Sequence, residues 1–128
     1  MNKKLAIIGV ILGMLAVVLG AFAAHGLKPL ISADAMATFQ TGVRYQMYHG
    51  LLLLFISTTP MLEAKIKRSI LFLVIIGLIL FSGSIYGLAT NNLTGFDFKA
   101  IGFITPIGGL LLMLAWLIML IKFIKLKV

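Results

Sequence analysis

Long apolar blocks separated by short polar stretches make up this chain. Residues 5–24 form a run of 20 residues without a charge, the length at which a helix crosses a hydrocarbon core of about 30 Å. Residues 70–89 and 100–121 are two further blocks of spanning length. Another apolar stretch follows His49. The pattern predicts membrane-spanning helices at about 5–24, 45–62, 70–89 and 100–121.

The second predicted helix differs from the others because its first part is polar. Nothing between Ser32 and Thr58 breaks a helix, and Ser32 suits the N-cap with Asp34 in the positive first turn. Residues 32–44 are only mildly apolar, so we expect them to lie in the membrane interface or to protrude above it.

Glycine and proline mark two further local features. Gly26 before Pro29 predicts a C-cap that ends the first helix. Pro106 lies early in the last span and is expected to free a helical carbonyl near Gly102, which protein or water would then have to line.

Charge predicts the orientation of the helices. The 128 residues are 62% hydrophobic and 11% charged, and the net charge of +8 comes from cations at the ends of the apolar runs. A cytoplasmic N-terminus leaves three cations outside (Lys28, Arg44, Lys99) and eight inside, as the positive-inside rule requires. We therefore expect one all-α domain over residues 1–128, an integral membrane four-helix antiparallel bundle with both termini in the cytoplasm. The inner cations are Lys3, Lys4, Lys65, Lys67, Arg68, Lys122, Lys125 and Lys127.

Motifs for catalysis, metals and nucleic acids are missing from the sequence. The absence of cysteine excludes disulfides, thiolate catalysis and cysteine-based metal sites. There is no phosphate-binding glycine loop, no GxSxG motif and no pair of carboxylates on one helix face. His25 and His49 have no carboxylate at metal-ligand spacing, and the cations do not interleave with aromatic residues. No enzymatic activity, metal, cofactor or nucleic-acid partner is expected.

Small residues recur along the first helix at spacings of three and four, at Gly9, Gly13, Ala16 and Gly20. Such a strip lets a neighbouring helix approach closely. Chance in a glycine-rich membrane protein is the alternative explanation.

Polar side chains gather near the start of the second span, in residues 41–49. Each is costly in hydrocarbon unless it has a partner or water. Gly42, Gln46 and His49 share one helix face, while Arg44 and Tyr48 point to a neighbouring one. With the topology above, polar residues of all four helices reach one depth on the extracytoplasmic side. The predicted cluster is His25, Arg44, Gln46, Tyr48, His49, Ser82, Ser84, Tyr86 and Thr105.

Three interpretations of this cluster remain open. The side chains can join helices, each polar pair contributing about 0.6 kcal/mol. They can line a small binding cavity or ion path, or the tyrosines can be interfacial belt residues. We expect a structural or interaction module, with membrane lipid and either a second copy or another membrane protein as partners. The alternative is a small transporter, channel or ligand-binding module. A third hypothesis is a module that recruits anionic phospholipid through the eight inner cations, although topology alone already explains those cations.

Four motifs resemble one known family. They read GAFAAHGL at 20–27, FQTGVRYQMYH at 39–49, FSGSIY at 81–86 and ITPIGG at 104–109. In this order the motifs resemble those of the YgdD/YwdK family, small bacterial inner-membrane proteins carried as a domain of unknown function, with a similar small transmembrane protein in eukaryotes. The resemblance implies a four-span protein of the bacterial cytoplasmic membrane and brings no activity, substrate or catalytic residue.

Overall fold

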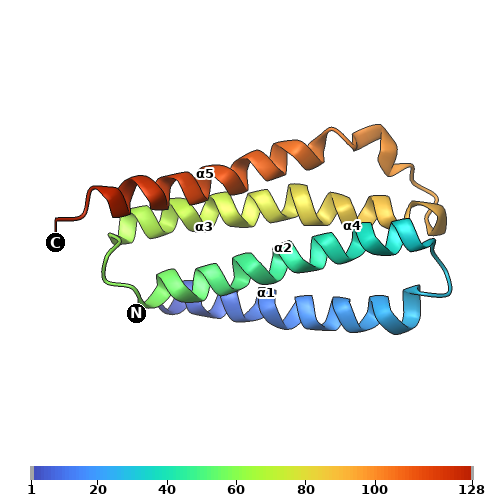
Figure 1. Cartoon of the computed structure of the whole chain (residues 1–128), viewed down its shortest axis with the longest axis horizontal. Helices are drawn as coiled ribbons and strands as arrows, with labels where there is room; N and C mark the ends of the chain where they lie inside the picture. Colours follow the sequence, from blue (N-terminus) through green and yellow to red (C-terminus); the bar gives the residue numbers. More distant parts are fainter. Residues whose placement is uncertain (1, 128) are drawn as a thin grey trace.

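The computed structural model describes residues 2–127, which form four long helical rods and contain no strand (Figure 1). The all-α prediction is therefore confirmed. The first rod is α1 (Lys3–Phe22) extended by the π-helical turn η1 (Ala23–Leu27), and the second is α2 (Ala33–Thr58). The third combines α3 (Ala64–Leu78), the π-helical turn η2 (Ile79–Gly83) and α4 (Ser84–Ala89). The 3-10 turns η3 (Asn91–Leu93) and η4 (Phe98–Ile101) lead to the fourth rod, α5 (Ile104–Ile124).

Three of these rods are long and apolar enough to cross a membrane, namely Lys3–Leu27, Ala64–Ala89 and Ile104–Ile124. The 26 residues of α2 give it similar length, but its polar first half lowers its mean hydropathy. The helix has no break at residue 44, and Phe39 and Val43 are buried against other rods. The backbone is therefore continuous, and burial of the helix begins at Phe39, since none of residues 33–38 is buried. The interfacial position of residues 32–44 stays a prediction.

Helix ends follow the sequence signals in part. The Ser32 hydroxyl accepts a hydrogen bond from the Ala35 N–H at 3.1 Å, which confirms the predicted N-cap of α2. The third rod begins at Ala64, six residues before the predicted span, because residues 64–69, which include Lys65, Lys67 and Arg68, form its first turns.

Two local predictions are wrong. Gly26 lies inside η1, and no glycine in residues 2–127 has a positive φ, so it is not a left-handed C-cap. Pro106 lies in the first turn of α5, where a backbone N–H has no helical acceptor in any case. No carbonyl is freed, and the Gly102 carbonyl accepts the N–H of Thr105 at 3.4 Å.

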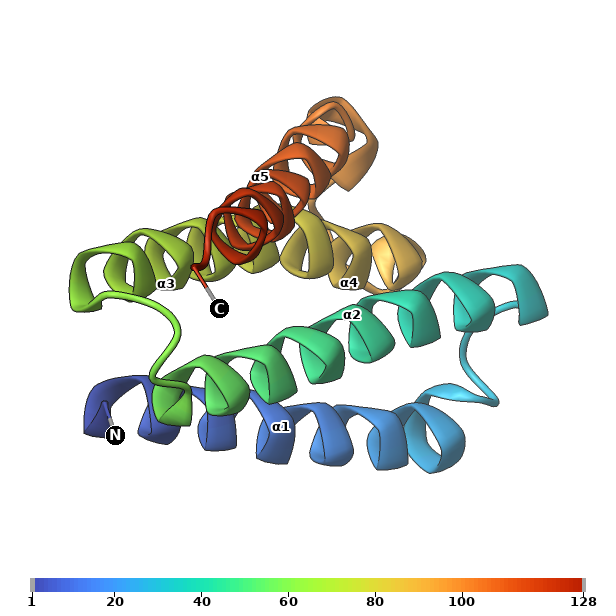
Figure 2. The same cartoon turned by 60° about the vertical axis from the view of Figure 1, so that its left-hand side comes forward.

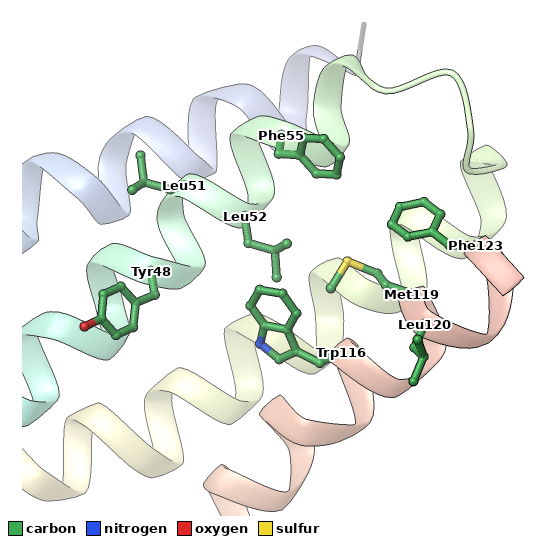
Figure 3. Close-up of a pocket in the computed structure, with 8 residues that line it drawn as sticks. All are labelled: Tyr48, Leu51, Leu52, Phe55, Trp116, Met119, Leu120 and Phe123. Atoms are coloured by element: carbon green, nitrogen blue, oxygen red, sulfur yellow. The ribbon is translucent and has the colours of Figure 1, made fainter.

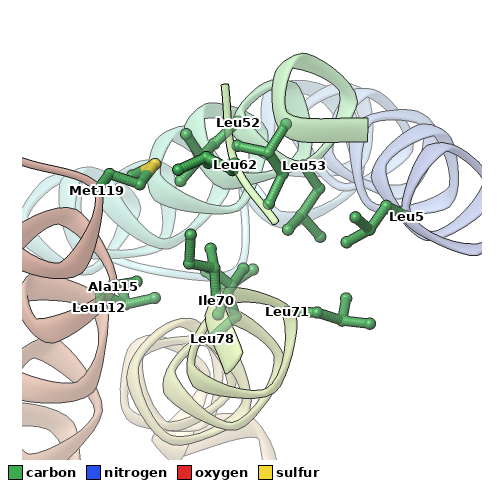
Figure 4. Packing of buried hydrophobic residues seen from close by; sticks show 12 residues of the cluster. Leu5, Leu52, Leu53, Leu62, Ile70, Leu71, Leu78, Leu112, Ala115 and Met119 are labelled. Carbon is green, nitrogen blue, oxygen red and sulfur yellow. The ribbon is translucent and has the colours of Figure 1, made fainter. Parts of the chain in front are cut away.

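The rods pack as two antiparallel hairpins, α1 with α2 and the third rod with α5 (Figures 1 and 2). The hairpins meet where α2 lies against α3, η2 and α4. Both chain ends and the α2–α3 connection lie at one end of the molecule (Figure 1). Near that end, buried aliphatic side chains of all four rods form the larger core, with Leu53, Ile70 and Val74 fully covered (Figure 4).

Glycines bring the backbones together within each hairpin. A Cβ atom on Gly9 would lie 2.7 Å from the carbonyl oxygen of Gly50, so α1 and α2 touch backbone to backbone at this level. In the second hairpin, a Cβ atom on Gly108 would lie 2.7 Å from the carbonyl oxygen of Gly77. Both contacts are typical of membrane helices that pack through small residues.

Candidate functional site

The central polar contact of the molecule joins three rods through Gln46. The Gln46 amide Nε2 donates to the carbonyl oxygen of Leu12 in α1 at 3.0 Å. The Tyr86 hydroxyl of α4 donates to Gln46 Oε1 at 2.7 Å. Gln46 is buried, and this Gln46–Tyr86 bridge uses both ends of its amide.

Serines of the third rod make the next contacts. Ser82, in the π-helical turn η2, donates to the carbonyl oxygen of Gly42 in α2 at 2.9 Å. The Ser84 hydroxyl lies within hydrogen-bond distance of the Thr105 hydroxyl in α5 and of the Leu80 carbonyl oxygen at 2.6 Å. A π-helical turn inserts one extra residue into a helix and re-aims the side chains beyond it. Here the turn lies where the rod presents hydroxyls to two different neighbours.

His49 connects α2 with α5. Trp116 donates its indole N–H to His49 Nε2 at 3.1 Å, and His49 Nδ1 lies 2.7 Å from the carbonyl oxygen of Tyr45. Because an indole N–H can only donate, Nε2 must accept, and the proton must be on Nδ1, where it is donated to the carbonyl. We assign the Nδ1–H tautomer from these contacts. Both ring nitrogens are thus engaged, which leaves neither free to bind a metal ion.

Three members of the predicted cluster lie outside these contacts. His25 is exposed on η1, and Arg44 is exposed with its Nη2 donating to Thr41 Oγ1 in its own helix at 3.1 Å. Tyr48 is half exposed and lines a groove on the opposite side of α2 from the Gln46–Tyr86 bridge. Four separate contacts between rods therefore use six of the predicted residues, namely Gln46, His49, Ser82, Ser84, Tyr86 and Thr105, whereas His25, Arg44 and Tyr48 take part in none of them.

The cluster does not share one depth, and that expectation is wrong. Ser84 and Thr105 meet near the start of α5, but Gln46 reaches Leu12, about 14 Å along α1 from Lys3 and about 22 Å from Leu27. The His49 contact to Trp116 lies about 18 Å beyond the start of α5. The polar groups descend from one end of the bundle to its middle, because α2 begins at Ala33 and this places Gln46 and His49 about 20 and about 24 Å along it.

The four predicted packing residues of α1 lie along its side that faces α2. Gly9 and Ala16 are buried, and Gly13 and Gly20 are partly buried. Cβ atoms on Gly13 and Gly20 would lie 3.6 Å from the side chains of Met47 and Val43, respectively.

Two grooves flank the line where the hairpins meet, and both are largely apolar. One, of about 500 Å³, lies between α2 and α5 and is lined by Tyr48, Phe55, Trp116 and Phe123 among others (Figure 3). The other, of about 480 Å³, lies between α1 and the third rod, and its lining includes Gln46, Ser82 and Tyr86. No buried side-chain nitrogen or oxygen in residues 2–127 is without a hydrogen-bond partner. Gln46, Ser82 and Tyr86 border the second groove, but their polar atoms are paired with groups in other rods, and the remaining lining is almost entirely apolar.

Several residues that shape the site had no signal in the sequence reasoning. Trp116 is the only tryptophan of the chain and lies in the middle of an apolar span, far from the membrane–water interfaces where tryptophan is enriched. Gly50, Gly77 and Gly108 were also missed, because each belongs to a helix contact whose partner cannot be known before the fold.

Together the four rods, their apolar surfaces and their internally paired polar groups define a small α-helical membrane protein. The sequence profile of DUF423, described as a protein family of unknown function, matches residues 19–109, and the chain belongs to this family. It is a protein of the bacterial inner membrane, as the resemblance of its motifs implied.

Similar proteins cover almost the whole chain. The UPF0382 inner membrane protein YgdD of Escherichia coli K12 is 37% identical over 128 residues, covering 98% of this chain and 93% of that protein. A UPF0382 membrane protein of Haemophilus influenzae is 38% identical over 116 residues, 91% of this chain and 89% of the relative. One from Staphylococcus haemolyticus is 40% identical over 126 residues, 96% and 97% of the two chains. No solved structure matches the chain. Nothing in these relatives indicates catalysis.

Proposed function

We propose that this protein is a structural or interaction module that crosses the cytoplasmic membrane four times, with both termini in the cytoplasm. The packing of α2 against α1 supports the fourth crossing. Gly50 touches Gly9, and the Ser57 carbonyl accepts the N–H of Asn2 at 2.7 Å, so α2 accompanies α1 to its first residues. The polar groups of α2 can enter hydrocarbon because other rods satisfy them.

Charge supports the orientation. The end that holds both termini and the α2–α3 connection carries eight cations of the sequence, and the opposite end carries three. Short loops follow the positive-inside rule, so the end with eight cations belongs in the cytoplasm.

One observation carries the assignment of the polar cluster to structure instead of transport: every buried polar side-chain atom in residues 2–127 has a partner within the protein. A permeation path or a polar ligand site needs donors and acceptors that face an open cavity. Here the donors of Gln46, Ser82 and Trp116 are all directed at acceptors in other rods. The proposal includes no catalytic activity. Its partners are membrane lipid and either a second copy of the chain or another membrane protein.

Variants of the His49–Trp116 contact test this proposal. His49→Ala removes the acceptor of a buried indole N–H and should lower the unfolding temperature in detergent. The double variant His49→Leu/Trp116→Phe replaces both polar partners by apolar groups and should recover most of that loss. Proton and potassium leakage through proteoliposomes should be the same for wild type and both variants. A flux that the wild type carries and the restored double variant has lost would contradict the proposal.

A further inference from the structure

Two adjoining pockets, of about 340 and about 550 Å³, open between the first turns of α1 and α3. Their lining includes four cationic residues, Lys3, Lys4, Lys67 and Arg68. Neither pocket is lined by a carboxylate in the described part of the chain. Glu63 instead lines a separate pocket with Lys122 and Lys125. The α1–α3 end therefore has a concave, uncompensated positive surface, which we call the cationic mouth.

The cationic mouth continues into an apolar groove along the same two helices. The mouth is lined by Leu5 of α1 and Leu71 of α3. One helical turn further toward the C-terminal end of each helix, Ile8 and Ile75 line the groove of about 480 Å³. The groove follows α1 as far as Leu19, about 21 Å from Leu5. That length exceeds one leaflet of a hydrocarbon core about 30 Å thick. The groove exists because α1 and α3 each pack on α2 and make little contact with each other.

We propose that an anionic phospholipid binds here, with its headgroup phosphate in the cationic mouth and an acyl chain in the α1–α3 groove. Basic pockets between membrane helices on the cytoplasmic side suit phosphate headgroups, and the apolar groove suits the chain that follows. The leaflet rests on the proposed topology, whereas the binding itself does not. A second copy of the protein is a poorer occupant, because it would bring cations to the same end of a chain whose net charge is already +8.

The positive-inside rule alone does not explain this arrangement. Lys65 and Lys127 satisfy that rule equally well, yet neither lines the cationic mouth. These two residues therefore provide a matched control that removes the same charge from the same end of the molecule.

Native mass spectrometry of the full chain from mild detergent tests the proposal with dioleoyl phosphatidylglycerol and dioleoyl phosphatidylcholine as probes. Wild type should retain phosphatidylglycerol in preference to phosphatidylcholine. Lys4→Gln/Arg68→Gln should weaken phosphatidylglycerol binding about 10- to 30-fold, while Lys65→Gln/Lys127→Gln should leave it close to wild type. Equal weakening by the two double variants, or no preference for the anionic lipid, would overturn the proposal.

A second pair of variants tests the groove. Leu15 lines it and Val17 does not, and both are exposed, at 44% and 62%. Leu15→Trp should fill the groove and weaken phosphatidylglycerol binding at least about fivefold, whereas Val17→Trp should not. Soluble glycerol 3-phosphate, at the same concentration as the lipid, should not displace phosphatidylglycerol, because it lacks the acyl chain that binds the groove. Effective competition by glycerol 3-phosphate, or a protein dimer that only Leu15→Trp disrupts, would overturn lipid occupancy. The fold is checked independently by the unfolding temperature of each variant without added lipid.

Discussion

The Tyr86 hydroxyl donates a 2.7 Å hydrogen bond to Oε1 of Gln46, which lies 40 residues earlier in the chain. This bond joins the two hairpins, because Tyr86 belongs to the third rod and Gln46 to α2. The second bond of the same amide, to the Leu12 carbonyl oxygen, connects α2 with α1. Phe39 packs on the Tyr86 ring with centroids 4.9 Å apart, so the tyrosine is held on both its apolar and its polar side. A bridge of this kind specifies one mutual position of the hairpins, which apolar packing alone specifies less sharply.

The Gln46–Tyr86 bridge should behave as a coupled pair. Tyr86→Phe leaves Gln46 Oε1 without its donor and should destabilise the fold by about 0.6 kcal/mol, the average for polar pairs in membrane helices, and by no more than the largest such value of about 1.7 kcal/mol. Gln46→Leu should cost a similar amount, and the double variant less than the sum of the two. Reversible unfolding in mixed detergent provides the free energies. Tyr48→Phe, at a half-exposed site, is the control and should change little, whereas simple additivity of the pair would argue against the bridge.

The Gly9–Gly50 contact should tolerate no side chain. Gly9→Ala would place a Cβ atom 2.7 Å from the Gly50 carbonyl oxygen, which forces the α1–α2 backbones apart. We expect a loss of about 1–3 kcal/mol, typical of overpacking, despite the better helix propensity of alanine. Gly83→Ala is the matched control, because the nearest atom to its Cβ would be 4.0 Å away. The unfolding temperature in one detergent should be lower for Gly9→Ala than for Gly83→Ala. Equal unfolding temperatures would contradict the close approach of α1 and α2.

The fold class could be predicted because apolar block length and helix-breaking residues act locally. Ser32 capped α2 as predicted, since an N-cap depends only on residues three positions apart. Gly26 was misjudged because η1 continues the helix through it, and a π-helical turn leaves no signal in residue type or spacing.

The site could be predicted only in its residue types. Costly polar groups in apolar blocks identified Gln46, His49 and Ser82, because each must find a partner. The partners of these side chains could not be predicted from the sequence. Leu12 and Gly42 contribute carbonyl oxygens, which every residue has, and Trp116 resembles any apolar residue of its span. The depth was misjudged because α2 is one continuous helix from Ala33, which places Gln46 and His49 about 20 and about 24 Å from its first residue.

Trp116 reports on the middle of the membrane. It is the only tryptophan, is 49% exposed in the α2–α5 groove, and lies about 12 Å from the end of α5. In proteoliposomes, lipids brominated at mid-chain should quench its fluorescence more than lipids brominated near the headgroup or soluble iodide. The variant Trp116→Phe/Phe103→Trp moves the indole to the start of α5 and should reverse that order. Strong iodide quenching of the wild type would place α5 outside the hydrocarbon.

The position of α2 decides whether the chain crosses the membrane three or four times. Lys28 precedes α2 and Lys65 follows it, so these two residues lie on opposite sides only if α2 spans. Because the protein has no native cysteine, Lys28→Cys and Lys65→Cys each introduce a single thiol. In intact cells a membrane-impermeant maleimide should label Lys28→Cys, and it should label Lys65→Cys only after permeabilisation. Asn92→Cys, in the connection before α5, should behave like Lys28→Cys. Labelling of Lys28→Cys and Lys65→Cys from the same side would show that α2 lies along the surface, and the internal pairing of its polar groups would then need another explanation.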